Sequence, residues 1–422
     1  MCHWFVQATE IARGLYETKS NQRFSVETLV RGASNALLSL KSADNLLIMH
    51  IMLVVQSLRF GGAERVASTL VNGWAEEGEQ VTVLTLDDAT QDFYSLDPRV
   101  RRVTLDLSCK SPDWRKFIWN NIRRVRALRA GVRSCDPDVV VSFMEKTNVL
   151  VLLATRGLSV PVVVEEHTDP RMHSVGGIAG WLRRLVYPRA CAVVVLTPSV
   201  IDWAREIAGS TPVHVIPNPI SHQFLGGEEI DKTRNRHTVV GMGRMEPEKG
   251  FDMLLRAFAQ CAARHPDWSL RIVGQGSERQ RLTALVDELR LGDQVSLDPV
   301  VKEPERVLRG SDLFVLSSRY EGFPMVLLEA MASGLPVVSF DCPSGPREMI
   351  REGIDGVLVP PNDVGALAGA LDRLMGAQDE RQQLGRRAVE VIQRFGLPTI
   401  LAMWNEVLMK AVSRNVSASA SA

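Results

Sequence analysis

Residues 312 to 340 have the sequence DLFVLSSRYEGFPMVLLEAMASGLPVVSF, in which two apolar, strand-like runs flank one short helical segment. Pro324 fits the first helical position, where no backbone amide is needed, and Gly334 follows the last apolar residue, where a left-handed glycine ends a helix. Strand-like runs and helical periods alternate in the same way from about residue 48 to 375. This alternation predicts an α/β fold built on doubly wound parallel sheets.

The alternation occurs in two series, separated at residues 216 to 224 by a break with two prolines and an asparagine. The first series has predicted strands at 48–55, 80–86, 138–143, 161–166, 192–196 and 213–216. The second series has predicted strands at 237–242, 270–274, 312–317, 335–340 and 356–359. Two Rossmann-like domains, 48–217 and 218–397, are therefore expected.

Three segments lie outside these two series. Residues 1–47 form an N-terminal extension to which the sequence assigns no role. A helix at 398–413, which carries Trp404, is expected to cross back to the first domain. The small polar residues 414–422 have little to bury and are expected to be disordered.

The composition limits the possible partners and the compartment. The 422 residues include 49 basic and 49 acidic side chains, so the net charge gives no support for a nucleic acid partner. Six cysteines without metal-ligand or C-x-x-C spacing indicate reduced thiols in a cytosolic protein. Neither an unbroken apolar run of about 18 residues nor a signal-peptide pattern is found, so we expect no spanning helix and no export.

Two glutamates, Glu321 and Glu329, lie eight positions apart in an otherwise apolar segment. Carboxylates are rarely buried without a partner, so something must satisfy them. The predicted helix begins after Glu321, at the carboxyl end of a strand, and contains Glu329. Free amides at such a helix start bind phosphate, and here they belong to Phe323, Met325 and Val326. The two carboxylates then suit the vicinal hydroxyls of the same ligand. In the alternative interpretation, Glu321 only caps the helix and Glu329 pairs with Arg347.

Two glycine-containing loops support the ligand interpretation. The segment GMGRMEPEKGFDMLLRAF at 241–258 follows the first strand of its series and places Arg244 and Lys249 before a helix. The third glycine of a G-x-G-x-x-G loop is missing there, so the loop is expected to hold a diphosphate by charge. In SLRFGGAERV, Gly61 and Gly62 either let the backbone approach a ligand or form a simple tight turn.

These motifs resemble the retaining glycosyltransferases of family 4, which have the GT-B architecture of two Rossmann-like domains facing across a cleft. The resemblance covers about residues 48 to 410 and rests on four stretches, namely the E-x7-E of Glu321 and Glu329, the GRMEPEKG loop, VGQGSER at 273–279 and RFGGAERV at 59–66. It implies a nucleoside diphosphate sugar as donor and no metal.

The resemblance also implies roles for individual residues. Glu329 would hold the ribose hydroxyls and Glu321 would lie near the donor sugar. Arg244 and Lys249 would neutralise the diphosphate leaving group. His167, in the loop EEHTDP, would border the donor sugar and the acceptor, although a lone histidine is more often structural. The remaining donor-binding positions are Gly61, Gly62, Gly243, Phe323, Pro324, Met325 and Val326.

Two further features qualify this assignment. A D-x-D sequence, which can hold a divalent metal, occurs at Asp136-Pro137-Asp138. It precedes a strand, on the amino side of the sheet, and is interpreted as a turn. Many family members have a glycine and an aromatic residue near the nucleobase, where this chain has Asp298 and Pro299. The expected donor is a UDP-sugar, but the chain lacks the usual motif for contacting its base.

Residues 111 to 133, SPDWRKFIWNNIRRVRALRAGVR, predict a helix capped by Ser111 with Pro112 at its first position. Helical spacing predicts a core stripe of Trp114, Phe117, Ile118, Ile122, Val125 and Leu128. The opposite face carries Trp119 among the cations Arg115, Lys116, Arg123, Arg126 and Arg133. Residues 112–130 are therefore expected to contact an anionic membrane surface or a lipid pyrophosphate, unless this is simply a solvated face.

Taken together, the sequence predicts a retaining, metal-independent hexosyltransferase of cell-surface polysaccharide assembly. Its acceptor would be a hydroxyl of a growing, lipid-linked glycan. It would work in the cytoplasm, at the inner face of the membrane. Two other classes stay open, a nucleotide-sugar 2-epimerase with the same architecture and a non-catalytic nucleotide-sugar-binding protein.

Overall fold

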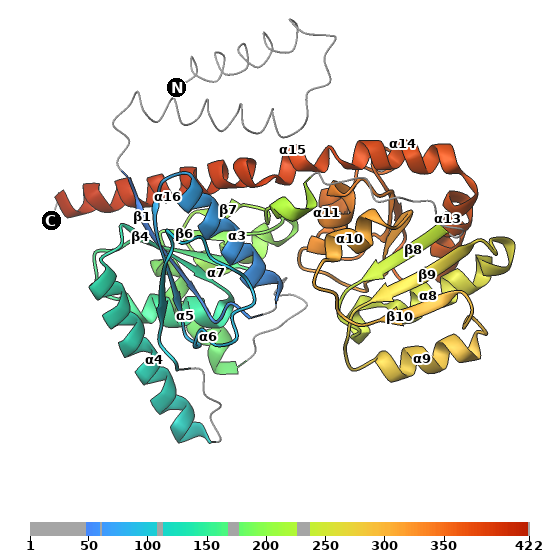
Figure 1. Cartoon of the computed structure of the whole chain (residues 1–422). Helices are drawn as coiled ribbons and strands as arrows, with labels where there is room; N and C mark the ends of the chain where they lie inside the picture. Colours follow the sequence, from blue (N-terminus) through green and yellow to red (C-terminus); the bar gives the residue numbers. More distant parts are fainter. Residues whose placement is uncertain (1–47, 60, 108–112, 168–176, 226–236, 421–422) are drawn as a thin grey trace, which may run out of the picture. The chain divides into compact units, whose positions relative to one another are not determined.

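The computed structural model describes residues 48–59, 61–107, 113–167, 177–225 and 237–420. The proposed extension at 1–47, the proposed cap Ser111 and the proposed first helical residue Pro112 lie outside these residues. All described residues fall within one compact unit, Ile48–Ala422 (Figure 1).

Seven parallel strands form a sheet in the order β3-β2-β1-β4-β5-β6-β7. The strands are β1 His50–Val55, β2 Gln80–Thr85, β3 Arg101–Thr104, β4 Val139–Phe143, β5 Val162–Glu166, β6 Ala192–Val195 and β7 Val213–Val215. The helices that connect them are α3 Gly62–Glu76, α4 Trp114–Cys135, α5 Glu145–Ala154, α6 Gly177–Val186 and α7 Ile201–Ala208.

Six parallel strands form a second sheet in the order β10-β9-β8-β11-β12-β13. The strands are β8 His237–Met242, β9 Trp268–Val273, β10 Val295–Asp298, β11 Leu313–Leu316, β12 Val337–Phe340 and β13 Val357–Val359. The helices are α8 Phe251–Cys261, α9 Arg279–Glu288, α10 Pro304–Arg309, α11 Met325–Ala332, α12 Pro346–Met349, α13 Val364–Gly376, α14 Gln378–Ala388, α15 Val391–Phe395 and α16 Leu397–Ala420. The predicted doubly wound fold with two parallel sheets is confirmed.

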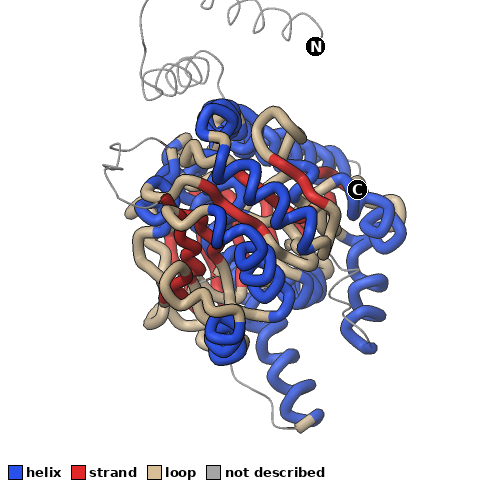
Figure 2. Tube along the Cα trace, turned by 90° about the vertical axis from the view of Figure 1, so that its right-hand side faces the viewer, coloured by secondary structure: helices blue, strands red, loops and turns tan. Residues whose placement is uncertain are grey.

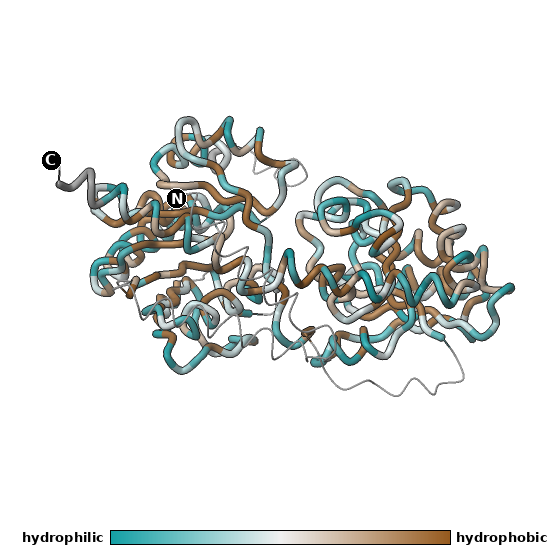
Figure 3. The backbone as a smooth tube through the Cα atoms, turned by 90° about the horizontal axis from the view of Figure 1, so that it is seen from above, coloured by the Kyte–Doolittle hydropathy of each residue, from teal (hydrophilic) through white to brown (hydrophobic). Residues whose placement is uncertain are grey.

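Helices cover both faces of the first sheet, as the alternation of side chains along β1 shows. Ile51 and Leu53 belong to a core that includes residues of α3 and α16, whereas Met52 and Val54 belong to a core that includes residues of α4 and α5. Strands lie among helices in Figure 2, and brown, hydrophobic stretches run through the tube in Figure 3. The strands are thus buried on both faces, which explains their continuous apolar runs.

The sequence analysis missed two strands, β3 and β10. Each lies at an edge of its sheet and pairs with one neighbour only. Both are partly exposed along their length, so they lack the apolar run that marks a central strand.

The chain passes from one sheet to the other between the end of β7 at Val215 and the start of β8 at His237. We propose that the domain boundary lies in this stretch, between residues 217 and 218. After the second sheet, α16 packs against α3, β4 and β5. Trp404, which is 1% exposed, meets Trp74 edge to face with ring centres 6.1 Å apart.

The expectation of a disordered tail at 414–422 is wrong for the residues described, because α16 continues through Ala420. The side-chain amide of Asn415 donates to the carbonyl oxygen of Ser159, which attaches the helix to the first half of the chain. The alanines at 418 and 420 also favour a helical continuation.

The expected core stripe of α4 is also wrong for most of its members. The helix is capped by Asp113, whose carboxylate accepts from the amide of Lys116 at 2.8 Å. Buried residues are confined to its last two turns, and the large apolar side chains of its first half are 40 to 68% exposed, namely Trp114, Phe117, Ile118, Trp119 and Ile122. A 22-residue helix is about 33 Å long, whereas the five-residue strand β4 spans about 17 Å, so the first half of α4 extends beyond the sheet (Figure 1).

Candidate active site

The helix α11 follows β11 at the carboxyl edge of the second sheet. Pro324 caps this helix instead of occupying its first position, which is Met325. At the other end, the amide of Gly334 donates to Met331 and that of Leu335 to Ala330, with Gly334 at φ +78°. These two bonds form a Schellman motif, so the expected left-handed stop is present.

Glu321 lies in the loop between β11 and α11 and is 8% exposed. Its Oε1 accepts from Lys249 Nζ at 2.6 Å and from Ser318 Oγ at 2.6 Å. The carboxylate is therefore satisfied by a cation and a hydroxyl, as its burial requires. Two of the predicted catalytic residues are in direct contact.

Close backbone packing sets the position of Lys249. Gly274, at φ +157°, packs on Gly243, and a Cβ on Gly274 would lie 1.9 Å from the Gly243 oxygen. Gly250, at φ +63°, ends the turn that contains Lys249, and a Cβ there would lie 2.1 Å from the Ser317 oxygen. Glycine is thus required at these positions, because the GRMEPEKG loop touches the neighbouring loops backbone to backbone.

Arg244, in the same loop, has a different environment. It is 70% exposed and pairs with Glu248 at 2.9 Å. A surface pair of this kind is weak, so the guanidinium can turn to a ligand at little cost.

Glu329 lies within α11 and is only 2% exposed. Its partner is Arg65 of α3, so the alternative pairing with Arg347 is wrong, and Arg347 instead pairs with Asp341. Burial raises the pKa of Glu329, and the nearby Arg65 guanidinium only partly offsets this effect. The sequence analysis did not single out Arg65, although it belongs to the RFGGAERV stretch.

The glycines before Arg65 are not strained. Gly61 caps α3 with an extended backbone at φ −177°, and its carbonyl oxygen accepts from the Tyr94 hydroxyl at 3.0 Å. A Cβ on Gly62 would meet nothing within 4 Å. Internal packing therefore does not explain Gly62, which is consistent with the approach of a ligand.

His167 follows β5 at the carboxyl edge of the first sheet. Its Nδ1 lies 3.4 Å from Glu165 Oε1, and its ring lies 5.9 Å from that of Phe143. The neighbouring Glu166 is fully buried, which raises its pKa to about 7, and it accepts from the Tyr187 hydroxyl. The contacts thus join Lys249 to Glu321 and Glu329 to Arg65, whereas His167 and Arg244 pair within their own segments.

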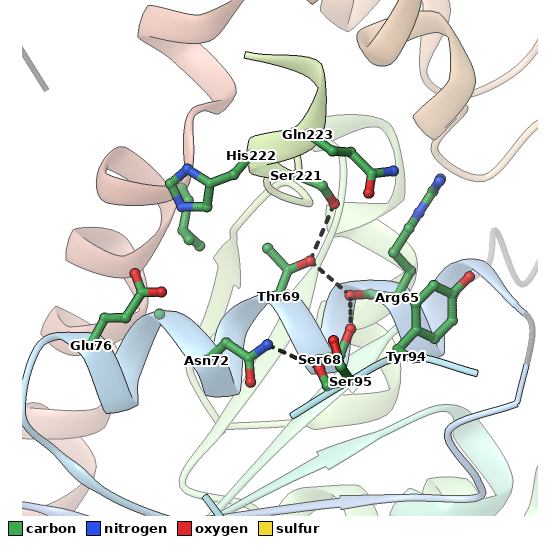
Figure 4. A pocket seen from close by; sticks show the side chains of 12 residues that line it. Arg65, Ser68, Thr69, Asn72, Glu76, Tyr94, Ser95, Ser221, His222 and Gln223 are labelled. Atoms are coloured by element: carbon green, nitrogen blue, oxygen red, sulfur yellow. Dashed lines mark hydrogen bonds between the residues drawn. The ribbon is translucent and has the colours of Figure 1, made fainter. Parts of the chain in front are cut away.

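A polar pocket of about 230 Å³ lies beside α3 (Figure 4). Arg65, Thr69 and Tyr94 line it together with Ser221 and Gln223 of the connecting segment. Thr69 Oγ1 and Ser221 Oγ are 3.3 Å apart. The pocket reaches Arg65, but Glu321, Glu329 and Lys249 are not among the described residues that line it.

The D-x-D sequence has a structural role. Asp136 ends α4 in a left-handed conformation, and Asp138 accepts from the amide of His50 at 2.7 Å. Across the described part of the chain, no three histidine, cysteine or acidic side chains are grouped so that they could hold a metal ion.

Two parallel α/β sheets, with a carboxylate and cation pair at the edge of the second, are the architecture of a GT-B protein. Two family models match the chain, Glycosyltransferase Family 4 over residues 60–224 and Glycosyl transferases group 1 over residues 228–391. The chain belongs to the family 4 (group 1) glycosyltransferases, which are retaining enzymes.

Several bacterial proteins are similar to the chain. An exopolysaccharide phosphotransferase of Streptomyces coelicolor is 32% identical over 84% of this chain, which spans only 40% of that longer protein. An N-acetyl-D-galactosaminyltransferase of Campylobacter jejuni, named for a glycan on PP-undecaprenol, is 26% identical over 86% of this chain and 98% of its own length. An amylovoran biosynthesis glycosyltransferase of Erwinia amylovora is 27% identical over 82% and 96%.

Solved structures show the same fold. Sucrose-phosphate synthase from Thermosynechococcus elongatus has a TM-score of 0.74 at 20% identity, with 87% of this chain and all of that chain covered. Anabaena HepE in complex with UDP has a TM-score of 0.71 at 20% identity, with 86% and 100% covered.

Proposed function

We propose that this glycosyltransferase moves a sugar from a UDP-sugar to a hydroxyl of a growing, lipid-linked glycan in cell-surface polysaccharide assembly. The observation that carries the proposal is the buried ion pair of Lys249 with Glu321, which lies in the loop that leads into α11. The names of the Campylobacter and Erwinia relatives support the glycan acceptor.

Each residue has a separate proposed role at this site. Glu329 accepts from the ribose hydroxyls and Glu321 lies at the donor sugar. Lys249 and Arg244 stabilise the diphosphate as it leaves, while the amides of Phe323, Met325 and Val326, beside Pro324, bind its oxygens. Gly61, Gly62 and Gly243 allow the backbone to approach the donor, and His167 faces the acceptor side.

The test is a titration of Glu329→Ala and Glu321→Ala with UDP. A hydrogen bond to a charged group contributes about 1.5 to 3 kcal/mol, so losing the ribose contact should weaken UDP binding by roughly 10-fold to 150-fold in Glu329→Ala only. The exposed Glu303 provides the control variant Glu303→Ala. If Glu329→Ala binds UDP like the parent, the ribose assignment is wrong.

The reaction itself is tested with UDP-sugars in the presence and absence of a lipid-linked glycan. Transfer should require the acceptor. Conversion of the sugar without any acceptor would indicate a 2-epimerase instead, and donor binding without turnover under any condition would indicate a binding protein.

We further propose that α4 docks the enzyme on an anionic membrane, where a lipid-linked acceptor would lie. Between Trp114 and Cys135 the helix has no acidic residue, and its first half exposes both large apolar side chains and cations. On α6, which packs against α5 as α4 does, Trp181 and Leu185 are also exposed. In the part of the chain that the structure describes, no helix is long and apolar enough to span a bilayer.

Sedimentation with phosphatidylglycerol vesicles tests this docking. Replacing Arg115, Arg123 and Arg126 by glutamine should weaken binding by roughly 100-fold, because each cation near the surface contributes about 1 kcal/mol. The control replaces three exposed arginines of the second half, namely Arg264, Arg306 and Arg373. Equal binding of the two triple variants, or binding that does not change with salt, would contradict membrane docking by α4.

A further inference from the structure

One ion pair connects the helices of the two sheets at the proposed ribose site. Arg65 lies in the first turns of α3, after β1, and its guanidinium contacts Glu329 Oε1 of α11, after β11. Glu329 is almost fully buried, and about a fifth of the Arg65 side chain is exposed. Glu329, in the half of the molecule that is proposed to bind the donor, is thus paired with a cation from the other half.

The charges around Glu329 make its ionisation depend on Arg65. Glu305 of α10 adds a second negative charge, whereas Arg65 supplies the positive charge. The Tyr94 hydroxyl lies close enough to interact with Arg65, Glu64 and Glu329. Burial next to another carboxylate disfavours the ionised form of Glu329, so its charge depends on Arg65.

The ionised form matters for binding a ribose. A carboxylate offers acceptor sites on both oxygens and suits two adjacent hydroxyls, whereas a protonated carboxyl group loses one of these sites to its own proton. Hydrogen bonds to a charged acceptor are also about twice as strong as neutral ones. A protonated Glu329 would therefore bind ribose poorly.

We propose that Arg65 is a positioning residue for the donor, which keeps the Glu329 carboxylate ionised and oriented toward the ribose hydroxyls. This inference rests on the proposed ribose role of Glu329. It gives α3 of the first sheet control over the affinity of the second half for the nucleotide. Donor binding is then strongest when α3 and α11 are in contact.

The experiment measures UDP affinity by calorimetry between about pH 6 and 9. Because Arg65 favours the ionised form of Glu329, the UDP affinity of the parent should vary less with pH than that of Arg65→Met. In Arg65→Met, the pKa of Glu329 is higher still, so UDP should bind roughly 10-fold or more weakly at pH 7 and recover as the pH rises. Arg65→Lys, which keeps the charge, should restore most of the affinity at pH 7.

The control is Thr69→Ala, one turn further along α3 and in the same pocket, as Figure 4 shows. It should bind UDP like the parent at every pH. A uniform loss of affinity across the pH range in Arg65→Met, or no rescue by lysine, would overturn the inference, because a merely structural role predicts that result.

Two more variants keep the test decisive. If Arg65→Met does not fold, the comparison of Arg65→Lys with the parent across the same pH range takes its place, and a large loss at every pH overturns the inference. The Glu329→Ala titration separates this inference from the proposed function. If Glu329→Ala binds UDP normally, the ribose role fails, whereas a loss in Glu329→Ala with parental binding in Arg65→Met contradicts the role of Arg65 alone.

Discussion

Replacing Lys249 by methionine should affect both the stability of the protein and its affinity for UDP. The ammonium of Lys249 lies 2.6 Å from Glu321; the Lys249 side chain is 19% exposed and the Glu321 side chain 8%. The methionine keeps the apolar part of the side chain and removes the charge. Glu321 is then left with the Ser318 hydroxyl as its remaining side-chain donor.

The expected losses of stability and of UDP affinity follow from this geometry. Removing one member of a buried ion pair costs about 3 to 5 kcal/mol, because an uncompensated charge stays buried. We expect the lower value, about 3 kcal/mol, since Lys249 is partly exposed and Ser318 still donates. If Lys249 also binds the diphosphate, UDP affinity should fall by roughly 10-fold to 150-fold as well.

A double-mutant cycle with Glu321→Gln separates the two effects. Urea unfolding should show that Lys249→Met with Glu321→Gln recovers most of the lost stability, because the unpaired charge is gone. UDP titration should show that the double variant still binds weakly, since the amide does not replace the cation. Lys302→Met, at an exposed position, is the control and should change neither quantity.

One result would contradict a role of Lys249 in binding UDP. If the double variant binds UDP as tightly as Glu321→Gln alone, Lys249 is only the structural partner of Glu321. In that case the diphosphate would have to be held by Arg244 and the α11 amides.

Three further results are expected. Trp404→Ala should cost about 3 to 5 kcal/mol in urea unfolding, because the indole is fully buried, whereas Met409→Ala at an exposed position of α16 should cost little. Glu166 has a pKa raised to about 7 by burial, so it stabilises the fold at low pH and this contribution is lost as the pH rises through 7. Glu166→Gln should therefore remove about 3 kcal/mol of pH dependence between about pH 4.5 and 7, measured by unfolding at each pH. EDTA should leave turnover intact while Arg244→Ala lowers it, and recovery of an EDTA-treated enzyme by magnesium or manganese would contradict this.

The strands that the sequence predicted are those with a continuous apolar run. Such runs arise in central parallel strands, which are covered by helices on both faces. The edge strands β3 and β10 are partly exposed and carry mixed residues such as Arg101 and Ser296, so their pattern does not differ from that of a loop. The edge strands β7 and β13 were predicted because most of their residues are apolar, so an edge strand is lost only where its residues are mixed.

The error in α4 has another physical cause. Helical spacing shows that apolar residues share one side of a helix, but not what covers that side. The last turns pack on the sheet through Leu128 and Val132, while the same pattern continues past the end of the sheet to Trp114. The length of a helix relative to its sheet decides the outcome, and that length depends on the tertiary fold.

The partner of Glu329 was missed because the sequence analysis searched nearby in the chain and not across the fold. Strand order reverses around β1 and β4 in the first sheet and around β8 and β11 in the second, and ligands bind at such switch points. Arg65 follows β1, Lys249 follows β8, and both glutamates follow β11. The order of strands thus points to the few cations that follow β1 and β8, among them Arg65 and Lys249, whereas a search near Glu329 in the sequence gave only Arg347 as its partner. Once the strand order is known, the loops after the switch-point strands are the first places to search for the partners of a buried carboxylate.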